Sequence, residues 1–421
     1  MEKSVNIFSF ATLFFSALSF SQETDSIRKY SLKFQMTSIY QYHPGFSANY
    51  SGTNSMNPKE ESALSLTSTL YLDVPLWKGA TATFNPEMSG GEGLSQARGL
   101  GGFPNGETFR IGDTKPVVYV ARMLLEQKIK LGDNKTLQLV FGKFGLSDYF
   151  DDNSYSHDPR TQFLNWSLMT HGAWDYAANT RGYTDGLYAN YQFDSWQVRA
   201  SLTALPTYAN GPNVEFSFKD SNAINIEIEK NIVFKNNDSG NIKLLGFRNV
   251  AGMGNYAEAN SNFTTIPDIK STRQNGRTKY GIGLNMEYTH SDIWGIFARM
   301  SYNDGKNETW AFTEIDRSAQ LGISLKGKMW NRPDDFGGIA LVANGLSNPH
   351  EEYQKLGGNG FMIGDGTLNY GIEQIAEVYY SFLVPNTHIW LSPDYQFAMN
   401  PAYNKDRGPV SFFAIRFHTE F

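Results

Sequence analysis

Hydrophobic and polar residues alternate along most of the chain, and the pattern is clearest at its C-terminal end. In residues 411–421, every second position is aromatic, aliphatic or threonine: Phe413, Ile415, Phe417, Thr419 and Phe421. The positions between them hold alanine or ionisable residues: Ala414, Arg416, His418 and Glu420. Because a strand points successive side chains to opposite faces, this segment predicts a β-strand with one apolar and one polar face. A membrane barrel would place the apolar face in lipid and Phe421 in its aromatic girdle, whereas a soluble sandwich would bury that face.

A second alternation covers residues 119–131. The residues expected on its apolar face are Tyr119, Ala121, Met123, Leu125, Ile129 and Leu131. The charged residues expected on its opposite face are Arg122, Glu126, Lys128 and Lys130. Gln127 also falls on the apolar face, and the pattern gives no reason for it. Four charged side chains require a strand face in contact with water. The surface of a soluble sandwich and the interior of a water-filled barrel both provide one.

The lengths of the connections distinguish these two architectures. Short turns are predicted at residues 75–79, 131–135, 193–195, 235–240, 290–293, 328–337 and 384–388. Longer segments alternate with them, at residues 43–62, 86–116, 145–182, 205–222, 251–277, 304–317, 346–373 and 399–410. An even strand number with short turns at one rim and long loops at the other is typical of outer-membrane barrels. We therefore predict an all-β fold, a transmembrane antiparallel β-barrel of about 16 strands with short periplasmic turns and long extracellular or inward-folding loops.

The composition is compatible with this architecture and excludes some functions. The 421 residues include no cysteine, which excludes disulfides and thiolate metal sites. The mean hydropathy of −0.41 is that of a soluble protein, yet a barrel strand exposes only alternate residues to lipid, so averaging hides the signal. The formal net charge of −6 argues against a nucleic-acid partner, which needs a basic surplus, and against a phosphate-selective pore.

The first residues predict export. Lys3 precedes an apolar stretch at residues 7–18, and Ser19 and Ser21 are small residues suited to cleavage before Gln22. The stretch is too short to span a bilayer, and no later segment reaches eighteen consecutive apolar residues. We therefore expect a signal peptide over residues 1–21 and a single barrel domain over residues 22–421, in the outer membrane of a Gram-negative bacterium.

The longest connection resembles a block of a known family. Residues 143–183 are rich in aromatic residues, and a loop of this length and composition is typically functional rather than disordered. This block, together with residues 85–93, 99–107, 308–317 and 394–411, resembles the carbohydrate-selective porins (OprB-like) of Gram-negative outer membranes. The resemblance covers nearly the whole predicted mature chain and is poorest at residues 213–238.

That resemblance implies a sixteen-stranded barrel through which monosaccharides and small oligosaccharides pass by facilitated diffusion. The expected partners are these sugars, outer-membrane lipids and the barrel-assembly machinery, which would recognise the C-terminal strand ending at Phe421. A monomer and a homo-oligomer both remain open. We expect no enzymatic activity and no cofactor.

Charged and aromatic residues are the predicted lining of the channel. A lumen with both signs of charge can hydrogen-bond sugar hydroxyls without accumulating one kind of ion. Strand alternation points seven charged residues inward: Asp73, Arg122, Glu126, Glu287, Arg299, Glu377 and Arg416. The long connections add Glu87, Arg98, Arg110, Asp158, Arg160, Trp166, Trp174, Asp175 and Arg181. The alternative role for most of these residues is to attach a loop to the barrel wall.

Other motifs and functions are less well supported. Residues 90–102 are rich in glycine but lack the Gly-Lys-Ser/Thr sequence of a phosphate-binding loop. Asp151, Asp152, Asn153 and Asp158 resemble part of a calcium loop, but its central glycine and terminal glutamate are missing, so a structural calcium is not supported. The alternatives are an outer-membrane barrel enzyme of the lipase or protease type, a porin for other small solutes, and a secreted sugar-binding β-protein.

Overall fold

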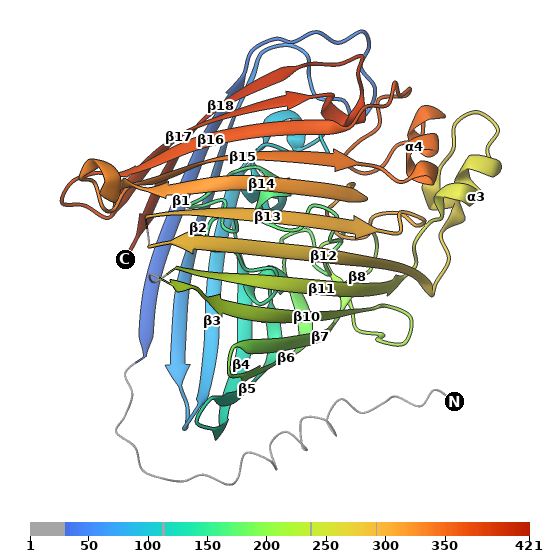
Figure 1. Cartoon of the computed structure of the whole chain (residues 1–421). Helices are drawn as coiled ribbons and strands as arrows, with labels where there is room; N and C mark the ends of the chain where they lie inside the picture. Colours follow the sequence, from blue (N-terminus) through green and yellow to red (C-terminus); the bar gives the residue numbers. More distant parts are fainter. Residues whose placement is uncertain (1–29, 112–113, 236–237, 292) are drawn as a thin grey trace, which may run out of the picture.

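The computed structural model describes residues 30–111, 114–235, 238–291 and 293–421, and these ranges form a closed barrel of sixteen antiparallel strands (Figure 1). The barrel strands are β1 (Ser31–His43), β2 (Glu61–Pro75), β3 (Ala80–Gly91), β4 (Val117–Gly132), β5 (Lys135–Phe144), β6 (Thr184–Phe193), β7 (Trp196–Thr203), β10 (Asn222–Val233), β11 (Ser239–Ala251), β12 (Arg277–His290), β13 (Trp294–Asn303), β14 (Arg317–Lys326), β15 (Phe336–Gly345), β16 (Glu373–Leu383), β17 (Ile389–Met399) and β18 (Val410–Glu420). Each strand pairs with its neighbours in sequence, and β1 pairs with β18. This architecture confirms the predicted fold class. The predicted signal peptide, residues 1–21, lies outside the described residues.

The alternation of β18 places its two faces as predicted. Phe413 and Ile415 are 48% and 58% exposed on the outside of the barrel, whereas Arg416 and His418 are buried inside. The backbone N–H of Phe421 donates to the carbonyl of Phe34 on β1 at 2.8 Å. The C-terminal strand is therefore paired on both sides, so the sheet has no open edge.

Alternation predicted the wrong face for two residues of β4. Ala121 is an extra residue without a cross-strand partner, because Arg122 pairs with Asn85 while Val120 pairs with Pro86. This bulge reverses the alternation, so that Tyr119 points into the barrel and Ala121 is fully buried. The physical reason is Pro86, which has no N–H to donate to the strand ladder.

The unexplained Gln127 has a structural role at the end of the same strand. Its side-chain carbonyl accepts a 2.8 Å hydrogen bond from the indole N–H of Trp77, in the turn between β2 and β3. Its amide donates to the carbonyls of Lys78 and Lys128. Gln127 therefore attaches this turn to the outside of β4.

The connections differ in length at the two rims. Short turns join β2–β3, β4–β5, β6–β7, β10–β11, β12–β13, β14–β15 and β16–β17, and the remaining connections are long. The 3₁₀ helix η6 (Gly327–Trp330) lies in the β14–β15 turn. The long connections contain β8 (Leu205–Pro206), β9 (Val214–Glu215), α2 (Trp166–Met169), α3 (Tyr256–Ser261), α4 (Asn348–Lys355), η1 (Leu94–Gln96), η2 (Gly106–Arg110), η3 (Leu146–Asp148), η5 (Ile269–Thr272) and η7 (Pro401–Tyr403).

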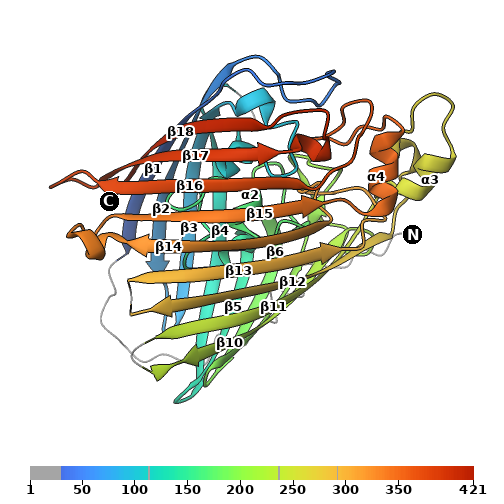
Figure 2. The same ribbon diagram turned by 45° about the horizontal axis from the view of Figure 1, so that its top comes forward.

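The long connections occupy the second rim and the interior. Helices α3 and α4 pack together beyond the strand ends (Figure 1), where Tyr256 and Tyr353 form a small buried cluster. The connection between β5 and β6, which contains α2, runs inside the ring of strands (Figure 2). Among the helices of the described ranges, none is long and apolar enough to cross a membrane.

Candidate channel constriction

An arginine of the barrel wall holds the inserted β5–β6 loop. Arg299 on β13 is fully buried, and its Nε lies 2.9 Å from Oδ1 of Asp151. Its other nitrogens donate to the carbonyls of Asp151, Ser156 and Leu168 at 2.7–3.1 Å. Asp151 is one of the residues that resemble a calcium loop, and here its carboxylate pairs with a guanidinium.

Two further wall residues bind the backbone of the same loop. Arg416 on β18 donates to the carbonyls of Pro159 and Thr161, both at 2.8 Å. The carboxylate of Glu377 on β16 accepts a 3.0 Å bond from the N–H of Asn165. Arg416 and Glu377 therefore attach the loop through its backbone groups, in addition to the Arg299–Asp151 side-chain pair.

Two more of the predicted acidic residues, Glu287 and Asp175, also accept hydrogen bonds from backbone N–H groups. Glu287 on β12 accepts a 2.7 Å bond from the N–H of Ser154. Asp175, within the loop, accepts bonds from the N–H groups of Trp310 and Ala311 at 2.9 Å each, which joins it to the connection between β13 and β14. These carboxylates therefore organise the interior.

The loop tryptophans lie in the largest apolar cluster. Trp166 stacks on Phe103 with ring centroids 5.2 Å apart, and the indole N–H of Trp174 donates to Asn225 at 3.0 Å. Six predicted channel residues are thus almost completely shielded from solvent: Trp166, Trp174, Asp175, Arg299, Glu377 and Arg416. They fit the alternative role, attachment of the loop, rather than direct contact with a solute.

Inward-facing glycines let the loop lie directly on the wall. A Cβ atom at Gly295 of β13 would lie 2.0 Å from Cζ of Tyr155, and one at Gly283 of β12 would lie 2.5 Å from the ring of His171. A larger residue at either position would displace the loop. Both imidazole nitrogens of His171 are buried without a hydrogen bond, and burial lowers the pKa of His171 to about 4 despite the carboxylate of Asp151 nearby.

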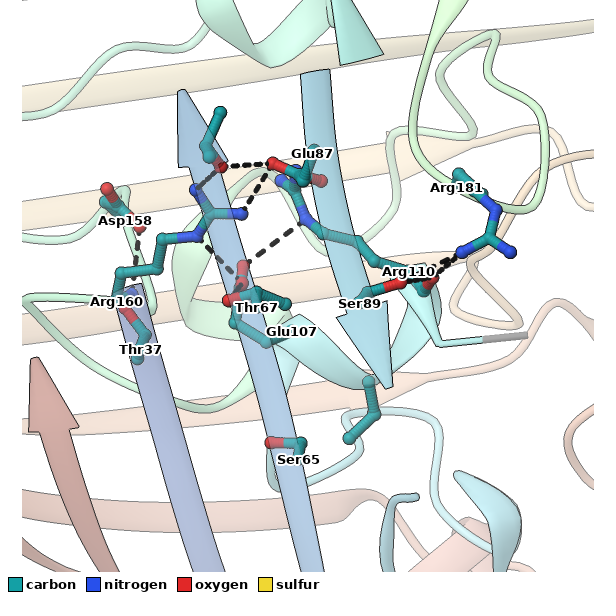
Figure 3. A network of polar contacts seen from close by, with 12 residues as sticks. Thr37, Ser65, Thr67, Glu87, Ser89, Glu107, Arg110, Asp158, Arg160 and Arg181 are labelled. Carbon is teal, nitrogen blue, oxygen red and sulfur yellow. Dashed lines mark hydrogen bonds and ion pairs between the residues drawn. The ribbon is translucent and has the colours of Figure 1, made fainter. Parts of the chain in front are cut away.

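A cluster of arginines and acids joins the tip of the loop to β2 and β3 (Figure 3). The guanidinium of Arg160 lies between two carboxylates, 2.9 Å from Glu87 and 2.8 Å from Glu107. Arg110 approaches the same two carboxylates at 3.4 and 3.3 Å. Thr69 on β2 donates to Glu87 at 2.6 Å and accepts from Arg160 at 3.0 Å. Two positive and two negative groups therefore compensate one another.

The cluster continues along β4 with groups that are partly exposed. Arg122 makes a two-pronged ion pair with Asp148, and these side chains are 17% and 25% exposed. The guanidinium of Arg122 lies 5.3 Å from the ring centre of Tyr183, and that of Arg181 lies 4.2 Å from the ring centre of Tyr119. Arginines thus lie over two neighbouring tyrosine rings, Tyr119 and Tyr183, whose centres are 6.4 Å apart. We call Glu87, Glu107, Arg110, Tyr119, Arg122, Asp148, Asp158, Arg160, Arg181 and Tyr183 the arginine–tyrosine network.

The loop carboxylates of this network are ionised. Burial opposes their ionisation, but the guanidinium of Arg122 holds the pKa of Asp148 below its ordinary value. Arg160 does the same for the pKa of Asp158, whose carboxylate also accepts the backbone N–H of Arg160 at 2.9 Å. The network therefore has four guanidinium groups and four carboxylates.

Three predicted channel residues belong neither to this network nor to the residues that attach the loop. Arg98 is exposed on the connection between β3 and β4. Asp73 and Glu126 face inward nearer the short-turn rim, where Asp73 accepts a 2.5 Å bond from Thr83 and Glu126 pairs with Lys128 at 2.9 Å.

Four members of the network were missing from the predicted lining: Glu107, Tyr119, Asp148 and Tyr183. Tyr119 donates to Glu87 at 2.6 Å, and alternation had placed it on the wrong face. The role of Asp148 could have been predicted from the sequence, because an acidic residue just after the end of a strand can reach an arginine of the neighbouring strand. Nothing in local sequence indicated that Glu107 and Tyr183 lie beside Glu87.

A recess of about 200 Å³ adjoins the inserted loop toward the short-turn rim and is lined by Gln162, Trp294 and Tyr379 among others. Another, of about 210 Å³, lies among the long loops beside Tyr208, Arg273 and Glu308.

A closed barrel with an apolar outside, a charged interior and an inward loop has the architecture of an outer-membrane channel. The family model described as carbohydrate-selective porin, OprB family, matches residues 55–421. The chain belongs to this family, and it is an outer-membrane porin with its short turns toward the periplasm.

Solved structures share the fold. The high-pH structure of OprB from Pseudomonas putida has a TM-score of 0.73 at 16% identity, covering 93% of this chain and 94% of that one. The outer-membrane channel DcaP of Acinetobacter baumannii has a TM-score of 0.53 at 12% identity, covering 95% and 99%. No curated protein sequence matches the chain.

Proposed function

We propose that the protein is a passive channel for neutral sugars, from monosaccharides to small oligosaccharides, and that they pass along the arginine–tyrosine network. The observation that carries this proposal is the group of partly exposed arginines, Arg110, Arg122 and Arg181, that lie over the rings of Tyr119 and Tyr183 beside ionised carboxylates. Guanidinium N–H groups donate to sugar hydroxyls, carboxylates accept from them, and ring faces pack on C–H surfaces. Family membership supports the same substrate class.

The balance of charge in the network favours neutral solutes over ions. The network contains four guanidinium groups and four carboxylates, so neither cations nor anions gain a continuous path of opposite charge. A sugar can replace the water on these groups with its own hydroxyls, which are both donors and acceptors. The partly exposed members Arg110, Arg122 and Arg181 would make these contacts, while the buried Arg160 positions the loop.

Sugar-dependent current block tests the proposal. The purified protein is inserted in a planar bilayer, and ion current is recorded while glucose, a disaccharide or a trisaccharide is added. We expect each sugar that enters to reduce the current. In Arg122→Gln, which leaves Asp148 without its guanidinium, the block should weaken several-fold and the current should become more cation-selective.

Arg98→Gln is the matched control, because it removes an exposed arginine outside the network. Its sugar block should equal that of the wild type. A current that ignores every sugar tested would instead indicate a porin for other small solutes, the alternative function.

Export belongs to the same proposal. Residues 1–21 would direct the chain across the inner membrane, and residues 22–421 would form the mature barrel. N-terminal sequencing of the protein extracted from outer membranes should begin at Gln22. A mature protein that begins at Met1 would contradict the predicted cleavage.

A further inference from the structure

The outward face of β11–β14 carries two arginines near the extracellular rim. Arg248 on β11 lies between the inward-facing Phe247 and Asn249, so alternation directs it to the outside of the barrel. Arg317 is the first residue of β14 and is exposed, while the next residue, Ser318, faces inward. The outward positions below these arginines are mostly apolar, among them Leu244 on β11 and Leu321 on β14.

Two tyrosines lie between the arginines. Arg248 is directly opposite Tyr280 of β12, and Arg317 is directly opposite Tyr302 of β13. Both tyrosines are about half exposed, at 53% and 47%. Tyr302 is directly opposite Ile282, so the β13–β14 pair is offset from the β11–β12 pair by two residues along the strands. Three strand spacings and this offset put the arginine backbones roughly 16 Å apart. The four residues form one staggered surface row, which we call the Arg–Tyr–Tyr–Arg row.

The row lies at the depth of lipid headgroups. On β12 the outward tyrosines are Tyr280 near the extracellular rim and Tyr288 near the other rim, and on β13 the outward face runs from Trp294 to Tyr302. Eight residues of strand span roughly 26 Å, or about 20 Å of height at a tilt of 40°. Tyr280 and Tyr302 therefore belong to the extracellular aromatic girdle, and the two guanidinium groups lie beside it.

The arginines of the row have no carboxylate partner within the described parts of the chain. Neither Arg248 nor Arg317 forms an ion pair with an Asp or Glu of the described ranges, whereas other arginines on the barrel strands do. By contrast, Lys143, which also faces outward, lies directly opposite the carboxylate residue Asp185 on the neighbouring strand. At headgroup depth a guanidinium without a carboxylate partner is free to pair with an anion from the lipid, and a phosphate would bind it by a charge-assisted hydrogen bond.

We propose that the Arg–Tyr–Tyr–Arg row binds a phosphorylated glycolipid of the outer leaflet. Arg248 and Arg317 each take one phosphate, and the tyrosine rings pack against the sugar between the phosphates. The acyl chains lie on the apolar wall below, where Gly246 leaves open space beneath Arg248. Arginine suits this role because its planar fork matches phosphate oxygens. This site is on the lipid face and is separate from the passage of sugars.

Native mass spectrometry of the detergent-solubilised barrel tests this site. The probes are lipid A with two phosphates, the same lipid without phosphates, and phosphatidylglycerol. We expect the wild type to retain lipid A at least tenfold better than either other lipid. In the double variant Arg248→Gln/Arg317→Gln, retention of lipid A should fall to the level of the dephosphorylated lipid.

The control is Lys230→Gln, which changes an outward charge at the periplasmic end, where Lys230 lies 4.6 Å from the ring of Trp196. This control should retain lipid A like the wild type. Ion conductance in planar bilayers verifies that the double variant is folded, and the two single variants replace it if it is not. Equal lipid A retention by wild type and variants, equal retention of the three lipids, or a dimer of this chain that covers the row would overturn the proposal.

Discussion

Replacing Arg299 by methionine should release the inserted loop from the wall. Arg299 and Asp151 are both fully buried, and the guanidinium also binds the carbonyls of Ser156 and Leu168. Removing one partner of a buried ion pair typically costs about 3–5 kcal/mol. Asp151 keeps 2.6 Å bonds from the N–H of His171 and from Asn285, so the low end of about 3 kcal/mol applies. That energy raises the population of released loop about a hundredfold.

Trypsin cleavage after Arg160 measures this population. Arg160 is 4% exposed and is held by Glu87 and Glu107, so cleavage requires release of the loop. When reclosing is faster than cleavage, the rate follows the open population, and Arg299→Met should be cut about a hundredfold faster than the wild type. Adding Asp151→Asn removes the stranded charge and should recover at least about 1 kcal/mol, or several-fold in rate.

Arg277→Met is the matched control. Arg277 pairs with the half-exposed Glu258 at the extracellular rim, and such a surface pair contributes about 1 kcal/mol or less. Its cleavage after Arg160 should not change. If Arg299→Met is cut at the wild-type rate, the wall charges do not hold the loop, and the assignment of the buried arginines is refuted.

Two further predictions concern the contact between loop and wall. Gly295→Ala puts a Cβ 2.0 Å from Cζ of Tyr155 and should lower the free energy of unfolding by about 1–3 kcal/mol in thermal or denaturant melts, whereas Gly246→Ala, which points into open space, should not. An equal effect of the two substitutions would contradict this packing. Because the pKa of His171 is lowered to about 4 in the folded protein, the unfolded chain takes up this proton first as the pH falls below 6.5, so stability should decrease between pH 6.5 and 4 by up to about 3 kcal/mol. Unfolding measured across this range should show a smaller decrease in His171→Asn, and an unchanged slope would contradict the buried neutral imidazole.

The sequence predicted the structure correctly wherever side chains alternate between the two faces of a strand without interruption. Alternation in β18 correctly separated lipid-facing Phe413 and Ile415 from interior Arg416 and His418, because closure of the barrel gives every strand the same two environments. It failed where the period changes. Pro86 breaks the hydrogen-bond ladder, Ala121 becomes an extra residue, and Tyr119 turns inward to bind Glu87.

The site was less predictable than the barrel because it depends on how loops fold back. Arg299 and Arg416 face inward as expected, yet the inserted loop covers both, so that they bind backbone carbonyls. No local pattern gives the position of that loop. Glu107 and Glu87 are far apart in sequence from Arg160, and only the folded loop brings the three together.

The most direct test of the central claim is entry of matched solutes into liposomes that contain the protein. Glucose, glucosamine and glucuronate have similar size and differ in charge. A bore with balanced guanidinium groups and carboxylates predicts faster swelling with glucose than with either charged analogue, and slower entry from mono- to trisaccharide. Faster entry of a charged analogue than of glucose, or no swelling with any sugar, would contradict a sugar-selective channel.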